Sequence, residues 1–572
     1  MTLFKNLKKD PAILKLQNKY YNFYLFSFLK LITRPDKIFR YLINKWIFLA
    51  NFYLYFKSQK KIKFQKKLDL GENNFLIICL QGLPYQYIQI WNIFRKKIFY
   101  DYSFHALSLK KNFMVNFYLK MLKIKIIYIE DICNNLSTTN EHNLNLELLK
   151  TEKDYLEYKY KNLEIGKIAL ATFFRAECSG EILINSENKK NIDRIIVSLL
   201  KTFGNLQIFF NNFNYTTIFI TEVFIEEYAL IAKIAFELKI NLIRFNFTAK
   251  DNCMIINKVT ESNYRKHHAS ITKNTFNLIS KTNTTVLNNF VFNNFKDRYS
   301  DKWFLSNRNQ LNKKDYSHSE IFKKLEINSN KKIGIIFSHI LYDLIYAYGE
   351  DVYNNYFDWL GHTLKIVSKL NNTQWLLKVH PSNLWRNELN GQLFGKYEEE
   401  RAIEIFLKNK LPKNIKLISH ETDISTFELM KISDLGVTVR GTTAVEMATM
   451  GKMVITAGSG RFDSFDFVNI ASSESEYQKM LNDFDKNNFS KFISKDQVVK
   501  NSTKFYYGLF NCKPIRLPFT DPKIQLLKDN AISMDDFNYL YDENIKINSK
   551  SLFDYVFDKN INEKELLNDY SI

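Results

Sequence analysis

Four apolar runs in the second half of this sequence alternate with helical patterns, and this order limits the fold more than any other feature. The runs lie at residues 333–337, 374–380, 435–439 and 453–458. Amphipathic helical patterns at 356–370 and 444–450 separate them. Strand, helix and strand in succession predict right-handed crossovers between parallel strands. We therefore expect an α/β domain with a parallel sheet over residues 331–515.

The first half of the sequence repeats this pattern with less regularity. The stretches 73–82 and 215–222 predict buried strands, and 224–239 predicts an amphipathic helix that leads to a strand at 240–245. From about residue 246 the pattern gives way to a segment rich in Asn, Lys, Thr and Ser. We therefore expect a first Rossmann-like domain over 71–325, whose last part is an irregular linker with some helices of its own.

The length of 572 residues and the distribution of charge indicate further segments at both ends. The net charge is +21, and residues 1–67 carry sixteen Lys and Arg against two acidic residues, so fourteen of these charges lie there. Residues 1–70 predict basic, aromatic helices, with apolar runs too short to span a bilayer. Such helices suit an anionic membrane surface, or else they pack on the first domain. Residues 516–572 predict C-terminal helices.

The cysteine content and the basic charge exclude some classes of function. The five cysteines are far apart, and none forms a Cys-x-x-Cys pair, so we expect neither a disulfide framework nor a zinc site. No nucleic-acid-binding motif accompanies the basic residues, and we expect no nucleic-acid partner. These features predict a protein of the reducing cytoplasm that contacts the inner face of the membrane peripherally.

Polar residues follow two of the predicted strands in the second domain. His380 ends one strand, and Pro381 stops that strand and stiffens the chain after it. The preceding strand runs into a polar turn that contains His339 and Asp343. Because the carboxyl ends of parallel strands meet at one edge of a sheet, both groups are expected at the edge where ligands bind.

A third strand end has the composition of an anion site. Arg440, Gly441, Thr442 and Thr443 lead into a helix whose free N–H groups favour phosphate, and Glu446 in its predicted first turn has the chemistry to bind ribose hydroxyls. Gly458 and Ser459 follow the next strand and leave room for a ligand. Taken singly, each feature also has an ordinary explanation, as a surface histidine, a helix cap or a contact with the helix dipole. Their shared position at strand ends favours a site.

Three segments of the second domain together resemble a known family. The segments are FSHILYD, WLLKVHPSNLW and SDLGVTVRGTTAVEMATMGKMVITAGSG, within residues 331–465. They are similar to the C-terminal half of capsule polysaccharide biosynthesis proteins, which include the Kdo-transferring capsule glycosyltransferases. The resemblance implies a GT-B fold, with two Rossmann-like domains facing across a cleft. It also implies that His380, Thr442 and Thr443 contact the phosphate of a nucleotide sugar and that Glu446 contacts its ribose.

The expected reaction is metal-independent transfer of a sugar to a growing capsular or lipopolysaccharide-type glycan. Side chains and a helix end would neutralise the leaving phosphate, with Lys378 or Arg440 adding charge. No Asp-x-Asp motif stands in a suitable position for a metal, and no cofactor is expected besides the donor substrate. The candidate general bases are Asp343 first, His339 second and Glu222 of the first domain third.

One departure from the family leaves the donor open. Kdo-transferring relatives carry a Gln-x-Asp-type motif where this chain has Ser338, His339 and later Asp343. The donor is therefore not fixed as a CMP-linked sugar. The alternatives are a CDP-polyol phosphotransferase of the teichoic-acid type on the same frame, and a non-catalytic protein that binds sugar nucleotides or acts as a membrane scaffold. The expected acceptor is a lipid-linked glycan or a polysaccharide.

Overall fold

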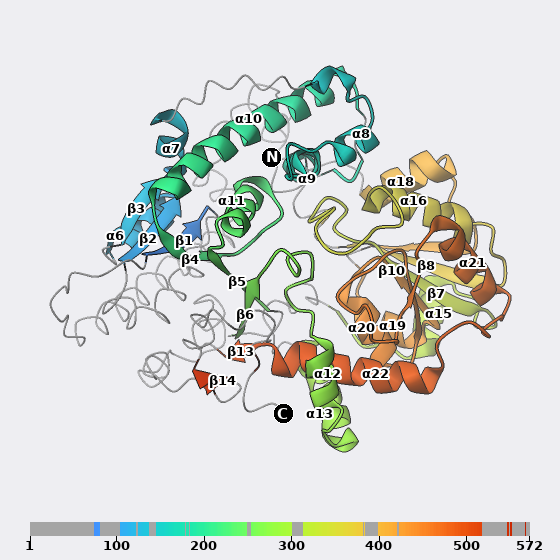
Figure 1. Cartoon of the computed structure of the whole chain (residues 1–572). Coiled ribbons are helices and arrows are strands. Elements are labelled where there is room, and N and C mark those ends of the chain that lie inside the picture. The colour runs from blue at the N-terminus through green and yellow to red at the C-terminus, as the bar shows by residue number, and fades with distance from the viewer. Residues whose placement is uncertain are drawn as a thin grey trace, which may run out of the picture.

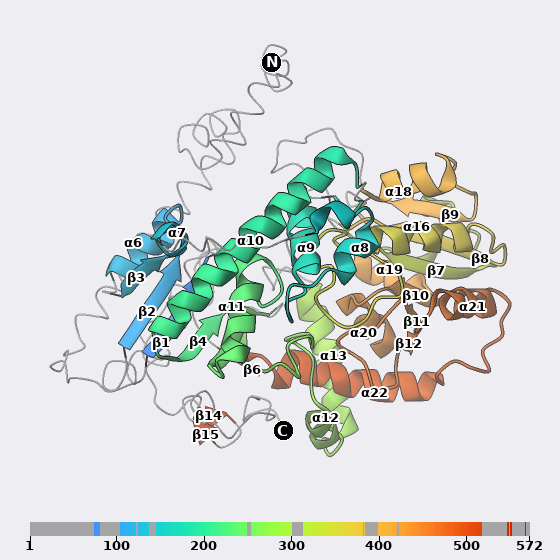
Figure 2. The same cartoon turned by 45° about the horizontal axis from the view of Figure 1, so that its top comes forward.

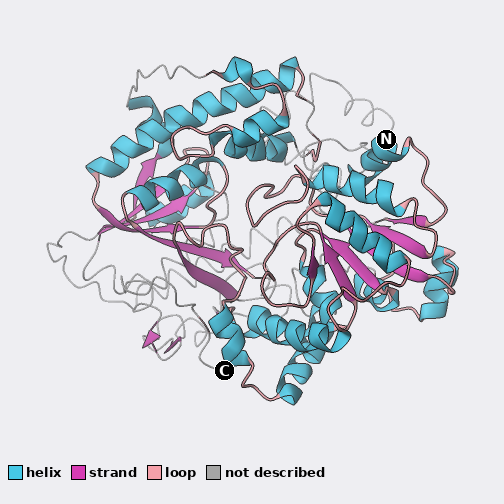
Figure 3. Ribbon diagram, turned by 45° about the vertical axis from the view of Figure 1, so that its right-hand side comes forward, coloured by secondary structure: helices cyan, strands magenta, loops and turns pink. Residues whose placement is uncertain are grey.

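The computed structural model contains two α/β domains, which lie side by side in Figure 1 and whose two sheets stand out in Figure 3. It describes residues 74–80, 103–121, 124–135, 145–177, 179–181, 184–248, 253–299, 313–380, 383, 398–419, 422–516, 546–547, 550–551 and 567. The statements below concern these residues. The predicted basic segment at 1–70 lies outside them.

The first sheet has seven strands in the order β13-β6-β5-β4-β1-β2-β3. Their bounds are β1 Asn74–Cys79, β2 Ser103–Ser108, β3 Lys125–Tyr128, β4 Tyr215–Ile220, β5 Asn241–Phe247, β6 Cys253–Val259 and β13 Ile515–Arg516. Strands β1 to β5 are parallel, while β6 runs antiparallel to both β5 and β13. The predicted strands at 73–82, 215–222 and 240–245 are thus confirmed as β1, β4 and β5.

Helices cover the first sheet and fill its core with large apolar side chains. They are α6 Phe113–Met121, α7 Ile129–Asn135, α8 Glu152–Glu157, α9 Ile165–Glu177, α10 Ser186–Asn212 and α11 Glu226–Glu237. Figure 2 shows the long helix α10 crossing this domain next to α9 and α11. Its apolar positions, including Ile192, Ile196, Leu199 and Phe203, are buried, as its amphipathic pattern requires.

The second sheet has six parallel strands in the order β12-β11-β10-β7-β8-β9. Their bounds are β7 Lys332–Phe337, β8 Thr373–Lys378, β9 Ile415–Ile418, β10 Leu435–Thr438, β11 Met453–Thr456 and β12 Asn469–Ile470. The helices between and after them are α16 Tyr356–Val367, α18 Glu398–Leu407, α19 Thr426–Ile432, α20 Thr442–Thr449, α21 Glu474–Asp485 and α22 Lys495–Tyr507. Because β7, β8 and β10 are covered on both sides, their sequences read as nearly continuous apolar runs.

Both sheets have the strand order of a Rossmann fold. When the strands of each domain are numbered in chain order, the order is 3-2-1-4-5-6, and β13 adds a seventh strand to the edge of the first sheet. The prediction of two Rossmann-like domains in a GT-B-like arrangement is confirmed. In such sheets, ligands bind where the strand order reverses, beyond the carboxyl ends of the first and fourth strands. That position is between β7 and β10 in the second domain and between β1 and β4 in the first.

The segment between the domains is more ordered than its composition indicates. It contains β6 of the first sheet and then α12 Lys273–Ile279, α13 Thr284–Arg298 and α15 His318–Leu325. Helices α12 and α13 pack against α22, which runs below the second domain towards the first in Figure 1. Through Ile515, the chain after α22 joins the first sheet. The return to the first domain therefore begins before residue 516.

The described part of the C-terminal segment after residue 516 contains two short strands, β14 Lys546–Ile547 and β15 Lys550–Ser551, which pair antiparallel. The helices predicted for 516–572 otherwise fall outside the described residues. Among the described helices, none is both long enough and apolar enough to cross a bilayer.

Candidate functional site

His339 lies at the point where the strand order of the second sheet reverses. It follows β7, and its Nε2 accepts the backbone N–H of Arg440, which follows β10, at 3.0 Å. The hydroxyl of Thr438 lies 3.2 Å from the same nitrogen, and the ring stacks on Tyr356. Burial lowers the pKa of His339 to about 3, and the charge of Arg440 adds to the effect. The ring is therefore neutral, and its accepting nitrogen is already occupied.

This geometry changes the expected role of His339. A general base needs a free lone pair towards the acceptor hydroxyl. The only accepting nitrogen of neutral His339 instead faces the backbone N–H of Arg440. In the structure, His339 joins the ends of β7 and β10 and does not offer a proton acceptor.

His380 is held through its backbone by a buried carboxylate. Its N–H donates to Oε1 of Glu399 at 3.1 Å and to the hydroxyl oxygen of Ser338 at 3.0 Å. Asn383 donates to the same Oε1 at 2.8 Å and to the carbonyl of His339 at 3.0 Å. Burial raises the pKa of Glu399. These contacts fix the turn after β8, and His380 lies close enough for its charge to lower the pKa of His339.

The strand before His380 is shorter than the sequence predicts. β8 ends at Lys378, so His380 stands two residues beyond the ladder, and Pro381 lies outside the described residues. The Nζ of Lys378 donates to the carbonyls of Ser419, at 3.2 Å, and Val379, at 3.4 Å. Burial lowers the pKa of Lys378 to about 7. These bonds direct the ammonium towards the end of β9, away from the predicted nucleotide position beside β10.

The start of α20 meets the predicted description of an anion site. Gly441 is the N-cap, and Thr442 and Thr443 open the helix as half-buried residues. Among the described residues, no side chain caps this end. A Cβ on Gly441 would lie 3.1 Å from the hydroxyl oxygens of Thr438 and Thr443 and 3.9 Å from Cε1 of His339. The structure thus brings His339, Arg440 and the two threonines together at one helix end.

Arg440 and the turn after β11 contact the loop before α16. The guanidinium of Arg440 is 6% exposed, forms an ion pair with Asp351 and lies over the ring of Tyr356. Gly458, with φ +134°, pairs with Asp351, and a Cβ there would lie 2.5 Å from the carbonyl of Glu350. Ser459 accepts the N–H of Glu350 at 2.7 Å. The predicted space for a ligand at Gly458 and Ser459 is therefore filled by this loop.

Glu446 lies deeper than the sequence indicates. Helix α20 begins at Thr442, which places Glu446 in the second turn, and its side chain is 1% exposed. Its oxygens receive Nη2 of Arg298 at 2.7 Å and the hydroxyl of Tyr299 at 2.6 Å. Contact with a ribose would require this pairing to open. The ion pair instead joins α20 to the end of α13.

Two of the candidate general bases meet between the domains. Asp343, after β7, lies 3.9 Å from Nη1 of Arg175 on α9. Glu222, after β4, is 8% exposed and accepts the N–H of Val223 at 2.8 Å. Burial raises the pKa of Glu222, the charges of Arg244 and Arg175 oppose this rise, and Asp343 adds to it. The structure thus places Asp343, Glu222 and Arg175 in one electrostatic cluster.

A cavity of about 110 Å³ opens next to this cluster in the first domain. Val223 and Phe224, which directly follow Glu222, line it together with Glu164, Lys167, Tyr264 and Tyr346. Aromatic rings with a few charged groups are the usual lining of a small-molecule pocket. Tyr346 reaches it from the second domain.

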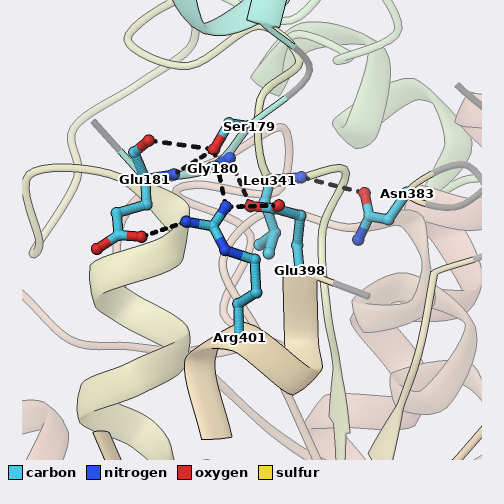
Figure 4. Close-up of polar contacts among 7 residues, drawn as sticks. All are labelled: Ser179, Gly180, Glu181, Leu341, Asn383, Glu398 and Arg401. Atoms are coloured by element: carbon cyan, nitrogen blue, oxygen red, sulfur yellow. Dashed lines mark hydrogen bonds and ion pairs between the residues drawn. The ribbon is translucent and has the colours of Figure 1, made fainter. Parts of the chain in front are cut away.

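A second set of contacts fixes the two domains to each other near His380. Figure 4 shows Arg401 of α18 between Glu398 of its own helix and the first-domain residues Ser179 and Glu181. Glu398 accepts the N–H of Gly180 at 2.8 Å. The absence of a side chain on Gly180 permits this approach, since a Cβ would lie 2.7 Å from that of Leu341. Glu398 directly precedes Glu399, whose carboxylate accepts the backbone N–H of His380. These contacts between the domains therefore lie next to the turn that holds His380.

Sequence reasoning missed four basic residues at the junction of the domains: Arg244, His267, His268 and Arg461. They stand on β5, in the loop after β6 and in the turn after β11. The charges of Arg244 and Arg461 contribute to lowering the pKa of both histidines, after burial. The adjacent pair His267-His268 and an arginine within an apolar strand were the available signals. The irregular composition around 246–330 concealed the two histidines.

The comparisons with known proteins give only distant likenesses. The sequence matches no protein-family model, and no curated protein matches it. A β-Kdo 2,7-transferase, KpsC of Thermosulfurimonas dismutans, is 11% identical, with 61% of this chain and 94% of that chain covered at a TM-score of 0.32. A glycosyltransferase from Rickettsia africae is 11% identical, with 82% and 99% covered at a TM-score of 0.28.

A UDP-GlcNAc 2-epimerase from Neisseria meningitidis bound to UDP-GlcNAc is 10% identical, with 76% of this chain and 99% of that chain covered at a TM-score of 0.24. At TM-scores this low, the fold assignment rests on the strand order of the two sheets.

Proposed function

We propose that this chain is a glycosyltransferase that transfers a sugar from a nucleotide-activated donor to a growing surface glycan. One observation carries the proposal. At the reversal point of the second sheet, a helix start with two hydroxyls, which no described side chain caps, lies beside His339 and Arg440, and the charge of His380 acts on His339. Such a point in a doubly wound sheet is where nucleotides bind. The motifs of residues 331–465 resemble those of capsule polysaccharide biosynthesis proteins, which supports the glycan acceptor.

In this proposal the donor phosphate lies at the start of α20. The N–H groups of the helix, the hydroxyls of Thr442 and Thr443 and the imidazole of His380 stabilise the negative charge that develops on the leaving phosphate. Arg440 adds positive charge next to the start of α20. Asp351 balances this charge when no phosphate is bound. His339 has a positioning role, because its bond to the N–H of Arg440 fixes the turn that presents Gly441. No metal is required by this arrangement.

Asp343 is the proposed general base. It extends from the second domain towards Arg175 of the first, and its side chain is 23% exposed and thus accessible to an acceptor hydroxyl. Glu222 is more buried and lies beside it. The acceptor would occupy the cavity that Val223 and Phe224 line and present its hydroxyl to Asp343.

Glu446 takes a different part in the proposal from the one that the sequence indicated. Its carboxylate holds α20 against α13 through Arg298 and Tyr299, and it thereby fixes the direction of the helix. Ribose recognition is left to residues nearer the end of the helix. Contact of residues 1–67 with the inner face of the membrane remains a separate prediction.

The experiment is a thermal-shift screen of CMP-, UDP-, GDP- and CDP-linked donors. A ligand that binds only the folded chain raises its melting temperature. One donor class is expected to stabilise the wild-type chain, and the double variant Thr442→Val/Thr443→Val is expected to lose that shift. The variant Thr284→Val/Thr285→Val, on the surface of α13, is the matched control. No stabilisation by any of these donors would contradict the proposal.

Product analysis separates the two possible transfers. A glycosyltransferase leaves a sugar without added phosphate in the polymer and releases the nucleotide. A polyol phosphotransferase leaves phosphate in the polymer and releases CMP from a CDP-linked donor. Phosphorus analysis of the product therefore decides between the two reactions, and a normal glycan made with His380→Ala would argue against catalysis by this site.

A further inference from the structure

Arg244 is a buried arginine whose hydrogen bonds are incomplete. It lies on β5 and is 3% exposed. Its Nη2 donates to the carbonyl of Lys266 at 3.2 Å. Its Nε and Nη1 are buried and have no hydrogen-bond partner among the described residues. An unpaired buried donor costs free energy, and a charged one costs more. Such a group therefore indicates that a bound ligand supplies its hydrogen-bond partner.

Arg461 presents a similar feature from the second domain, although its side chain as a whole is half-buried. Its Nε is also buried without a hydrogen-bond partner among the described residues. Its carbonyl accepts the hydroxyl of Ser270 at 2.7 Å, which joins the turn after β11 to the loop after β6. Burial lowers the pKa of Arg461 to about 10. The backbone bond thus fixes the turn, and the guanidinium remains available.

The other arginines of this region differ, because each faces a carboxylate. Arg175 pairs with Asp343, Arg298 with Glu446, and Arg440 with Asp351. Among the described residues, no ion pair involves Arg244 or Arg461. Arg244 acts on the buried carboxylate of Glu222 only through its charge, without an ion pair, so its two unpaired donors still call for an anion.

His267 and His268 lie beside both of these arginines. Their rings stack with centroids 4.2 Å apart, and His267 packs on Tyr348. Nδ1 of His267 accepts the N–H of Ala269 at 3.1 Å, which fixes the ring. Burial and the positive charges of Arg461 and Arg244 lower the pKa of both histidines well below the ordinary value. The positive charges of both arginines thus act on both histidines.

The neighbours of the pair indicate which substrate would supply the anion. The charge of Arg244 opposes the rise that burial causes in the pKa of Glu222. Besides burial, the pKa of Tyr348 responds to the charges of four groups, which are Glu222, Arg244, Arg461 and Asp343. The two arginines and the proposed general base Asp343 thus act on the same tyrosine, Tyr348. Phe224 packs on Tyr348 and lines the acceptor cavity. A group bound here would belong to the molecule that presents its hydroxyl to Asp343.

We propose that Arg244 and Arg461 together bind an oxyanion, a phosphate or a carboxylate, that the acceptor carries. This inference rests on the proposed glycosyl transfer, and it narrows the acceptor to an anionic glycan. The turn that carries Arg461 adjoins Arg440, because a Cβ on Gly460 would lie 3.0 Å from that of Arg440, so the site borders the donor phosphate position at α20. It is completed only when β5 and the turn after β11 lie together, so acceptor binding also stabilises the contact between the two domains.

The test is a calorimetric titration of inorganic phosphate into the full chain, saturated with the nucleotide that gives the largest thermal shift. Arg244→Gln is expected to weaken phosphate binding at least about tenfold, since a charge-assisted hydrogen bond contributes about 1.5–3 kcal/mol. Nucleotide affinity is expected to stay within about threefold of the wild type, because the threonines and α20 are unchanged. Arg194→Gln, an exposed arginine on α10, is the matched control.

Two further variants keep the test decisive if Arg244→Gln fails to fold. Arg461→Gln removes the second arginine and is expected to have the same effect as Arg244→Gln. Arg244→Lys keeps the charge and loses the planar fork, and is expected to recover only part of the phosphate affinity. In transfer assays, Arg244→Gln is expected to raise KM for an anionic acceptor and to leave KM for a neutral analogue unchanged.

The possible results separate this inference from the proposed function. Equal loss of nucleotide and phosphate affinity in Arg244→Gln would assign the arginines to the donor site and overturn the proposal. Phosphate affinity that is the same in all variants would also overturn it. If no nucleotide binds at all, the proposed function fails, and the titration of phosphate alone into the wild type and Arg244→Gln still decides whether the oxyanion site exists.

Discussion

Nε2 of His339 accepts the backbone N–H of Arg440 at 3.0 Å and so joins the ends of the two strands, β7 and β10, between which the strand order of the second sheet reverses. The bond fixes the turn that leads into α20. The same turn presents Gly441, Thr442 and Thr443 at the start of this helix. A neutral imidazole inside the domain thus determines the shape of the proposed phosphate site.

Replacement of His339 should weaken donor binding without removing a group that touches the donor. His339→Ala leaves the N–H of Arg440 without its acceptor and frees the turn, and we expect nucleotide affinity to fall about tenfold or more. Isothermal calorimetry measures this change. His318→Ala, at the start of α15, is the control. Unchanged affinity in His339→Ala would show that the turn holds its shape without the bond.

His339 should also make stability depend on pH. Its pKa of about 3 in the folded chain lies below the ordinary value of 6.5. Between these values the unfolded chain takes up a proton that the folded chain refuses, so the free energy of unfolding falls as pH drops, by up to about 1.4 kcal/mol per pH unit. Above pH 6.5 neither the folded nor the unfolded chain binds this proton, so His339 no longer makes the free energy of unfolding depend on pH. Urea unfolding of the wild type and His339→Gln should show their stability difference shrinking towards acid, whereas a constant difference would contradict the assignment.

Asp343→Asn should abolish most of the turnover and spare donor binding. Loss of a general base typically lowers the rate about 10²- to 10⁴-fold. Glu222→Gln is expected to lower it less, because Glu222 acts through its neighbours. Steady-state kinetics with the identified donor measures both variants, and Asp466→Asn on the surface of the same domain is the control. A larger loss in Glu222→Gln than in Asp343→Asn would exchange the two roles.

Arg401→Gln should loosen the contact between the domains. Arg401 bonds to Ser179 and Glu181 across the junction and to Glu398 on its own helix. Loss of these charge-assisted bonds should lower the midpoint of chemical unfolding and increase the radius of gyration in small-angle X-ray scattering. Arg194→Gln should leave both values unchanged, because exposed substitutions of this kind change stability by less than about 0.5 kcal/mol. A compact Arg401→Gln chain would show that the remaining contacts suffice.

Lys378→Met should leave nucleotide affinity within about threefold of the wild type. The ammonium bonds to the carbonyls of Val379 and Ser419 and so does not extend to the donor. The change should instead lower stability, because the buried carbonyl of Val379 and the partly buried carbonyl of Ser419 lose a donor. Calorimetry and urea unfolding measure the two effects separately. A loss of affinity with unchanged stability would return Lys378 to the nucleotide site.

The sequence predicted the strands that carry the proposed site because burial on both sides leaves a simple signal. β7, β8 and β10 read as apolar runs, and their order with α16 and α20 follows from the handedness of parallel crossovers. The helix start at Gly441 and Thr442 was visible from composition. The end of β8 was placed two residues too late, because Val379 continues the apolar pattern after the ladder has ended.

Other elements gave no clear sequence signal. β2 contains His105 and β6 contains Lys258, and each interrupts its apolar pattern, so neither was predicted as a strand. The burial of Glu446 by Arg298 was also unpredictable, since these residues are far apart in the chain. The filling of the Gly458 turn by Asp351 likewise depends on a loop that only packing positions.

The sequence by itself determined which strands and helices form and which strand ends carry polar groups, because hydrophobic periodicity and helix-start chemistry are local properties. Only the tertiary structure decided which of those groups share a site. It paired Glu446, Asp351 and Asp343 with arginines and left Arg244 and Arg461 without an ion pair among the described residues. The physical reason is that burial and charge pairing depend on contacts between residues far apart in the chain, and no local pattern encodes those contacts.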